Sequence, residues 1–270
     1  MPHKDSTPGT ILVATLLCIV CSFVVSLSAV ALRPLQKENK LLDQQKNILD
    51  ATGLSIGEYG KPASELSREQ IDTLSAWITP KLVDLETGEY NTEIDIAEYD
   101  TREAVTKKSE RIDIENPKYD LGEKYREKVA KVYFVTKPGE DGISQVVLPV
   151  YGKGLWSTLY GYMAIKSDLK TIQGLTFYEH GETPGLGGEV DNPDWKAQWE
   201  DKRLYDDSGV PAAEVRKGPA PSGDVYGVDG LSGATITSRG VTTLLRYWAS
   251  EDGYGPFLAK LQQEIASGDK

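Results

Sequence analysis

A threonine that follows three small residues is the best candidate for a reactive side chain in this 270-residue sequence. The run DGLSGAT occupies positions 229–235 and ends at Thr235. Because Ser232, Gly233 and Ala234 add little bulk, another backbone, an enzyme or a large ligand can come close to the Thr235 hydroxyl. The types and spacing of these residues therefore predict an accessible, reactive alcohol.

A helix is expected directly after this threonine. Apolar residues at positions 241, 244, 245 and 248 have the spacing of one helix face. Thr235 would then lie just before or at a helix N-terminus, where free N–H groups and the positive end of the helix dipole favour a phosphate. Taken alone, the local sequence favours a plainer interpretation, a Thr/Ser-capped helix after a glycine turn.

Two loops are further candidates for ligand contact. The first, GKGLWS at 152–157, completes neither a dinucleotide fingerprint nor a P-loop, and by itself it indicates a wide hairpin loop with a buried Trp156. The second, HGETPGLGGE at 180–189, has glycines that let its backbone approach a planar ligand. Its Glu182 and Thr183 could hydrogen-bond the polar edge of a ring, although without other information this loop is only a turn.

Other chemistries are excluded by the composition. The two histidines, His3 and His180, and the two cysteines, Cys18 and Cys21, cannot supply a zinc site or a disulfide framework in the soluble part. A hydrolase that uses Ser232 or Thr235 would have only His180 as a histidine base. The chain has 30 basic and 41 acidic residues, and its net charge of −11 argues against nucleic-acid binding.

The N-terminal part predicts a membrane anchor. Residues 10–32 are twenty-three residues without a charge, enough to cross a hydrocarbon core of roughly 30 Å. A cleaved signal peptide is the alternative, since small-residue sites occur at 26–31. Residues 33–56 predict an amphipathic helical stalk that stops at Thr52-Gly53. Lys and Arg are more frequent after the span than before it, which by the charge rule would place the C-terminal side in the cytoplasm.

The remaining chain predicts an α+β domain. Ser67 and Gln70 form a capping-box pattern that begins a short helix, and this helix is expected to include Ile78 and to end at Pro80. Four β-prone runs follow, at 128–135, 145–151, 158–165 and 169–178. We therefore expect an antiparallel or mixed sheet with helices packed against it. The region 57–128 carries no motif that indicates a function.

Four stretches of the sequence resemble the flavin-carrying C subunits of sodium-translocating NADH:quinone reductases. The run 229–235 matches the flavinylation motif Asp-x-x-Ser-Gly-Ala-Thr, which is shared with the flavin subunits of the related Rnf complexes. The loops at 152–156 and 182–187 resemble the segments Gly-x-Gly-Leu-Trp and Glu-Thr-Pro-Gly-Leu-Gly of the family. The run 28–49 also resembles the C subunits and separates this chain from the shorter Rnf relative.

The resemblance implies a covalent flavin. It assigns a phosphoester bond between Thr235 and FMN, apolar contacts to Leu155 and Trp156, and packing on the ring to Leu186. It gives Glu182 and Thr183 the role of orienting the ring or the ribityl chain. The other residues assigned to the cofactor are Asp229, Ser232, Gly233, Ala234, Thr237, Gly185 and Gly187.

Attachment of FMN would require a second protein. A threonine alcohol is a poor nucleophile, so the resemblance implies a separate flavin transferase that uses Mg²⁺ and takes FMN from FAD. Asp229 would assist this enzyme, either by docking or by holding the metal. The loaded chain would need no catalytic acid or base, because FMN itself holds one or two electrons.

The resemblance also implies a place in a complex. The chain would relay electrons from NADH towards ubiquinone with the other subunits, while sodium would move through the polytopic subunits, since an apolar helix without charge offers an ion no path. The implied order is a short cytoplasmic segment (1–9), a transmembrane helix (10–32), the stalk (33–56) and a periplasmic FMN-binding domain (57–270) on a bacterial inner membrane. A membrane-anchored extracytoplasmic binding domain without redox function is the alternative.

Overall fold

The structure is a computed structural model that describes residues 7–140 and 142–267. The chain divides into two compact units, Met1–Gln45 and Lys46–Lys270. Residues 1–6 of the predicted cytoplasmic segment 1–9 lie outside the described residues. Its last three residues belong to the first helix.

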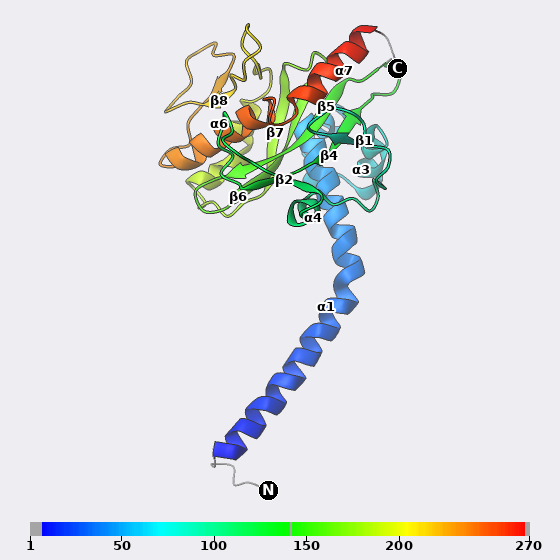
Figure 1. The fold of residues 1–270 in the computed structure, drawn as a ribbon, viewed down its shortest axis with the longest axis vertical. Helices are drawn as coiled ribbons and strands as arrows, with labels where there is room; N and C mark the ends of the chain where they lie inside the picture. Colours follow the sequence, from blue (N-terminus) through cyan, green and yellow to red (C-terminus); the bar gives the residue numbers. More distant parts are fainter. Residues whose placement is uncertain (1–6, 141, 268–270) are drawn as a thin grey trace. The chain divides into compact units, whose positions relative to one another are not determined.

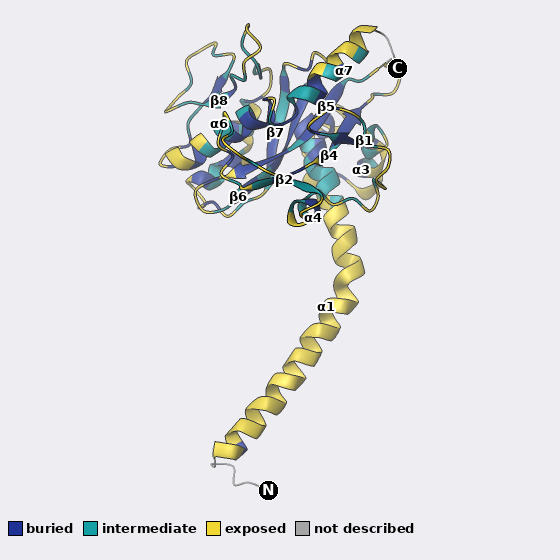
Figure 2. Cartoon of the chain, viewed as in Figure 1, coloured by how far each residue is buried: buried dark blue, intermediate teal, exposed yellow. Residues whose placement is uncertain are grey.

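The first helix, α1 (Thr7–Thr52), contains Pro34 and is continuous through the predicted span 10–32 and through the predicted stalk 33–56 as far as Thr52. Within the described residues it is the one helix that is long and apolar enough to cross a membrane. Its apolar side chains are exposed over the predicted span (Figure 2). It ends before Gly53, as predicted, because Gly53 has a positive φ of 68° that stops the helix and starts the short α2 (Leu54–Tyr59).

The second unit is built on an antiparallel sheet of five strands (Figure 1). The four predicted runs are confirmed as consecutive antiparallel strands, and a fifth strand, β1 (Ile78–Asp84), pairs at the edge with the first of them, β4 (Val129–Val135). The order in the sheet is β1 (Ile78–Asp84), β4 (Val129–Val135), β5 (Gln145–Lys153), β6 (Thr158–Lys166) and β7 (Ile172–Glu179).

Strand β1 corrects one prediction. Helix α3 (Arg68–Ser75) begins with the predicted capping box between Ser67 and Gln70. It ends at Ser75, and Ile78 and Pro80 belong to β1 instead of the helix. Proline lacks the N–H that a central strand must donate, so an edge strand tolerates it. The expectation that this helix runs to Pro80 was wrong because residues 78–84 pair with β4 along their whole length.

The remaining elements are short apart from two helices near the C-terminus. In chain order they are η1 (Ala63–Glu65), α4 (Thr101–Thr106), β2 (Arg111–Asp113), β3 (Tyr125–Glu127), η2 (Gly187–Asp191), α5 (Pro193–Ala197), β8 (Glu214–Val215), β9 (Gly227–Val228), α6 (Thr235–Trp248) and α7 (Gly255–Ser267).

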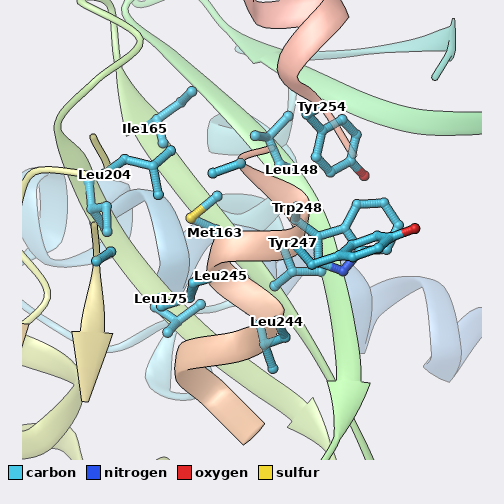
Figure 3. Packing of buried hydrophobic residues seen from close by; sticks show 14 of the residues in the cluster. Leu148, Met163, Ile165, Leu175, Leu204, Leu244, Leu245, Tyr247, Trp248 and Tyr254 are labelled. Atoms are coloured by element: carbon cyan, nitrogen blue, oxygen red, sulfur yellow. The ribbon is translucent and has the colours of Figure 1, made fainter. Parts of the chain in front are cut away.

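Helix α6 is fixed to the sheet by its apolar face. Leu244, Leu245 and Trp248 are fully buried, and Figure 3 shows them among sheet residues such as Leu148 and Met163. A fully buried leucine contributes roughly 2 kcal/mol. The predicted helix and its buried face are therefore confirmed, and they hold the first turn of α6 at a defined place beside the sheet.

Candidate functional site

Thr235 is the first residue of α6, and its side chain is exposed. Ala234 occupies the N-cap position, and no side chain in the described part of the chain caps this helix end. The first backbone bond of the helix runs from the Ser238 N–H to the Ala234 carbonyl, at 3.0 Å. The N–H groups of the first turn, before Ser238, therefore take no part in the hydrogen bonds of the helix. They can bind an anion next to the Thr235 hydroxyl.

The backbone before Thr235 is fixed by Asp229. One carboxylate oxygen accepts the Ala220 N–H at 2.7 Å, and the other accepts the side-chain amide of Gln198 at 3.1 Å. The Asp229 carbonyl accepts the indole N–H of Trp195 at 2.8 Å. Both carboxylate oxygens are thus used inside the protein. The predicted assistance of Asp229 to a flavin transferase stays a prediction, and its contacts here orient the motif.

An ion pair holds the loop that leads into the motif. Arg216 donates to Asp224 at 2.6 Å and holds the pKa of that carboxyl well below its usual range. Asp224 also accepts the N–H groups of Tyr226 and Gly227, each at 3.0 Å. No sequence pattern indicated these contacts, because they depend on the path of the loop.

The glycine-containing loop at 182–187 lies against the motif. A Cβ atom added to Gly233, which has a φ of 70°, would be 2.9 Å from the Cδ2 atom of Leu186. Gly185 also has a positive φ, of 75°. These two glycines allow backbone shapes and a close approach that other residues resist. The structure therefore brings together two segments that lie about fifty residues apart, as the flavin-site prediction requires.

Glu182 joins this loop to the two other segments. Its side chain is 6% exposed, and its two oxygens accept hydrogen bonds from the hairpin loop 154–157 and from the hydroxyl of Thr237 in α6. The hairpin loop is the predicted wide connection, since Lys153 pairs with Thr158 across it. The contacts seen for Glu182 are made within the protein, and its expected contact with a flavin ring stays a prediction.

Four large apolar side chains are exposed around these segments. Trp156 is 67% exposed, Ile236 55%, and Leu155 and Leu186 43% each. The plain interpretation of the hairpin loop, with a buried Trp156, is wrong, because the backbone of this loop is turned towards Glu182 and the indole is directed outwards. Sequence reasoning missed Ile236, although it is an apolar residue off the buried face of α6. Large exposed apolar groups are typical of a binding surface.

The other residues singled out from the sequence differ in exposure and in hydrogen bonding. Thr183 and Ser232 are exposed, whereas Gly187 is buried between Glu182 and Thr237. His180 binds Asp191 through Nε2 at 2.8 Å and accepts the Glu182 N–H through Nδ1 at 3.2 Å. Both ring nitrogens are hydrogen-bonded within the protein, which disfavours a hydrolase that depends on this histidine.

The arrangement fits a phosphorylated aromatic ligand such as FMN. The uncapped N-terminus of α6 and the exposed Thr235 hydroxyl suit a phosphoester, because N–H groups and the helix dipole stabilise its negative charge. Leu155, Trp156 and Leu186 suit a planar apolar ring. The residues that would hold the cofactor thus come from the hairpin loop, the glycine-containing loop and α6.

Comparisons with known proteins indicate a family and a cofactor class. A family profile described as an FMN-binding domain matches residues 154–250. The C subunit of the Na(+)-translocating NADH-quinone reductase of Yersinia pestis is 44% identical over 262 residues, which cover 97% of this chain and 95% of the relative. The C subunit from Pseudomonas aeruginosa is 45% identical over 267 residues, which cover 97% and 99%.

A solved structure extends the similarity to the fold. The crystal structure of Shewanella oneidensis NqrC is 35% identical in sequence and has a TM-score of 0.74, covering 84% of this chain and 99% of that chain. The α+β fold that the sequence predicted is confirmed. The chain belongs to the family of C subunits of Na(+)-translocating NADH-quinone reductases.

Proposed function

We propose that this chain is the subunit of a membrane-bound NADH:quinone reductase that carries FMN on Thr235 and relays electrons through it. Membership of the C-subunit family and the match to an FMN-binding domain support the flavin and the complex. The observation that carries the covalent link is the exposed Thr235 hydroxyl at the uncapped start of α6. FMN supplies one- and two-electron redox chemistry when it is bound.

The residues of this chain bind and orient the cofactor. The first-turn N–H groups of α6 and its dipole stabilise the charge of a phosphoester at Thr235. Leu155, Trp156 and Leu186 offer apolar surface to a planar ring and exclude water from one part of it. The buried face of α6 keeps Thr235 fixed relative to the sheet.

In the attachment reaction, Thr235 is the substrate. Its oxygen forms a bond to the FMN-side phosphorus of FAD, the bond from that phosphorus to AMP breaks, and AMP leaves. The hydroxyl proton goes to a base of a separate flavin transferase, which also supplies Mg²⁺. The contacts of His180 and Asp229 within the protein support an external base, because neither side chain is left to serve Thr235.

The proposal also covers the membrane anchor and the complex. Helix α1 anchors it to a bacterial inner membrane, and the soluble domain faces the periplasm, as the resemblance implies against the Lys/Arg count. The span 10–32 carries no charge, so sodium moves through other subunits and this chain conducts electrons. Protease treatment of spheroplasts tests the orientation: digestion of the soluble domain in intact spheroplasts supports it, and protection contradicts it.

Mass spectrometry of one tryptic peptide tests the covalent link. Trypsin releases residues 218–239, which contain Thr235, from the full chain purified from cells that express the transferase. We expect FMN on this peptide, with fragmentation placing it on Thr235. The variant Thr235→Ala should lose the flavin and its in-gel fluorescence after denaturation. Ser222 is an exposed serine in the same peptide, so the control variant Ser222→Ala should keep both. An unmodified wild-type peptide contradicts the proposal and favours the binding domain without redox function.

A further inference from the structure

Glu182 has a specific role within the proposed flavin site. We propose that it is a positioning residue whose carboxylate sets the position of Leu155 and Trp156 relative to Thr235. This role replaces the predicted contact of Glu182 with the flavin ring or the ribityl chain. This inference rests on the function proposed above. Glu182 would thus support the protein segments around the flavin.

The first oxygen of the carboxylate holds the hairpin loop. Oε1 accepts the backbone N–H groups of Leu155 at 3.0 Å, Trp156 at 2.9 Å and Ser157 at 3.4 Å. Three successive N–H groups that point at one oxygen fix the backbone of the loop. Since the loop backbone faces inwards to Glu182, the side chains of Leu155 and Trp156 are presented outwards. The same carboxylate thus determines where the two apolar groups lie.

The second oxygen reaches α6. Oε2 accepts the hydroxyl of Thr237 at 2.5 Å, and Thr237 is fully buried two residues after Thr235. A change in the position of this oxygen is therefore transmitted to the helix turn that carries the reactive hydroxyl. One side chain links the apolar surface for the ring to the attachment point for the phosphate.

Two glycines make room for this carboxylate. A Cβ atom at Gly154 would lie 2.6 Å from Oε1, and a Cβ atom at Gly187 would lie 2.6 Å from Oε2. Gly187 would also have a Cβ atom 2.6 Å from the Thr237 hydroxyl oxygen. Neither glycine has a positive φ, so close packing around Glu182, and not a special turn, explains why glycine occupies both positions.

The carboxylate is buried and makes its hydrogen bonds within the protein. Oε1 accepts three N–H groups, and Oε2 accepts the Thr237 hydroxyl beside Gly187, where a Cβ atom would lie only 2.6 Å away. A buried charge needs such partners, because leaving it unsatisfied is costly. Removal of the carboxylate leaves three N–H groups without an acceptor and frees the loop to move. Small displacements of reacting groups reduce rates strongly.

Two measurements on the full chain in detergent test this role. Selective ¹⁵N labelling of tryptophan gives one backbone amide signal for each of the five tryptophans, and Trp156→Phe identifies that of Trp156. Separately, purified flavin transferase with FAD and Mg²⁺ gives the kcat and KM of flavin incorporation. The amide signal requires no flavin, so it reports on Glu182 even if the wild-type chain is never loaded.

For Glu182→Ala we expect a moved Trp156 amide signal, unchanged signals from the buried Trp195, Trp199 and Trp248, and a kcat of incorporation at least about 10-fold lower. Glu182→Gln keeps an oxygen for the loop and an N–H₂ group for Thr237, so it should restore kcat to within about 3-fold. Thr237→Val removes only the link to α6. It should lower kcat and leave the Trp156 signal in place.

The outcomes separate the two proposals. An unmoved Trp156 signal in Glu182→Ala, or incorporation by this variant at the wild-type rate, overturns the positioning role. Should Glu182→Ala fail to fold, Thr237→Val decides in its place: wild-type incorporation by that variant overturns the link between Glu182 and α6. Absence of flavin from the wild-type chain refutes the covalent function alone.

Discussion

Replacement of Glu127 by glutamine is expected to change how the stability of the domain depends on pH. Glu127 ends β3, and its side chain is 1% exposed. Its Oε2 atom accepts the hydroxyl of Tyr151 at 2.6 Å. Burial raises the pKa of the carboxyl from 4.5 to about 7, although the Tyr151 hydrogen bond and the positive charge of Arg126 act in the opposite direction.

The sign of the effect follows from the protons bound in each state. Between pH 4.5 and about pH 7 the folded chain holds the Glu127 proton and the unfolded chain has lost it. The free energy of unfolding therefore falls as the pH rises through this window. The contribution of Glu127 is fully present below the unfolded pKa and is lost above the folded pKa. A shift of this size corresponds to about 3 kcal/mol, at 1.36 kcal/mol for each pKa unit.

Urea unfolding of the full chain in detergent, followed by tryptophan fluorescence, measures this effect. Glu127→Gln cannot titrate, so its unfolding free energy relative to the wild type should increase by about 3 kcal/mol between pH 4.5 and pH 8. Other titrating groups are common to both chains and cancel in the difference. A difference that stays constant across this range refutes the assignment. Tyr151→Phe removes a hydrogen bond that lowers the pKa, so it should move the window to higher pH.

Three further substitutions test the packing and the caps. Leu244→Ala should lower the unfolding free energy by about 2–5 kcal/mol in the same urea assay, because it opens a cavity under α6, and a loss below about 1 kcal/mol would contradict this packing. Ser67→Ala removes the cap bond to Gln70 and should cost about 1 kcal/mol without changing the FMN content per chain. Gly240→Ala places a Cβ atom against the Lys153 carbonyl oxygen, so α6 must shift and the FMN content should fall; unchanged content would contradict a fixed helix.

Local patterns predicted the elements that bury one face. The four β-prone runs and the helix after Thr235 have apolar residues at regular spacing, and each is confirmed. Strand β1 was not predicted, because most of its first half is exposed and Pro80 resembles a helix stop. Only its pairing with β4 makes this segment a strand. Edge strands depend on the neighbouring strand more than on their own sequence.

The roles of polar residues could not be read from spacing. Glu182 reaches a loop about twenty-six residues earlier and a helix fifty-five residues later. Asp229 binds Gln198 and Ala220, and neither of these two residues belongs to a sequence motif. Their residue types indicate the ability to accept hydrogen bonds, but their partners are set by the topology of the sheet and its loops. The exposed Trp156 follows from the same contacts, since Glu182 holds the backbone of its loop.

The N-terminus of α6 gives a last prediction that separates stability from function. Ser, Thr, Asp or Asn at an N-cap stabilises a helix by roughly 1 kcal/mol relative to alanine, yet Ala234 occupies this position. An uncapped end is favourable if a phosphate on Thr235 occupies the same N–H groups. Ala234→Ser should therefore raise the unfolding free energy of the flavin-free chain by up to about 1 kcal/mol.

In the flavin-loaded chain this gain should vanish, because the phosphoester already occupies the N–H groups that the serine hydroxyl would bind. Urea unfolding of both forms of Ala234→Ser, each compared with the wild type in the same form, measures the difference. An equal gain in the two forms would show that the phosphate does not bind the start of α6. A gain confined to the flavin-free form would mean that alanine at position 234 leaves the helix end open for the cofactor, at the expense of stability before loading.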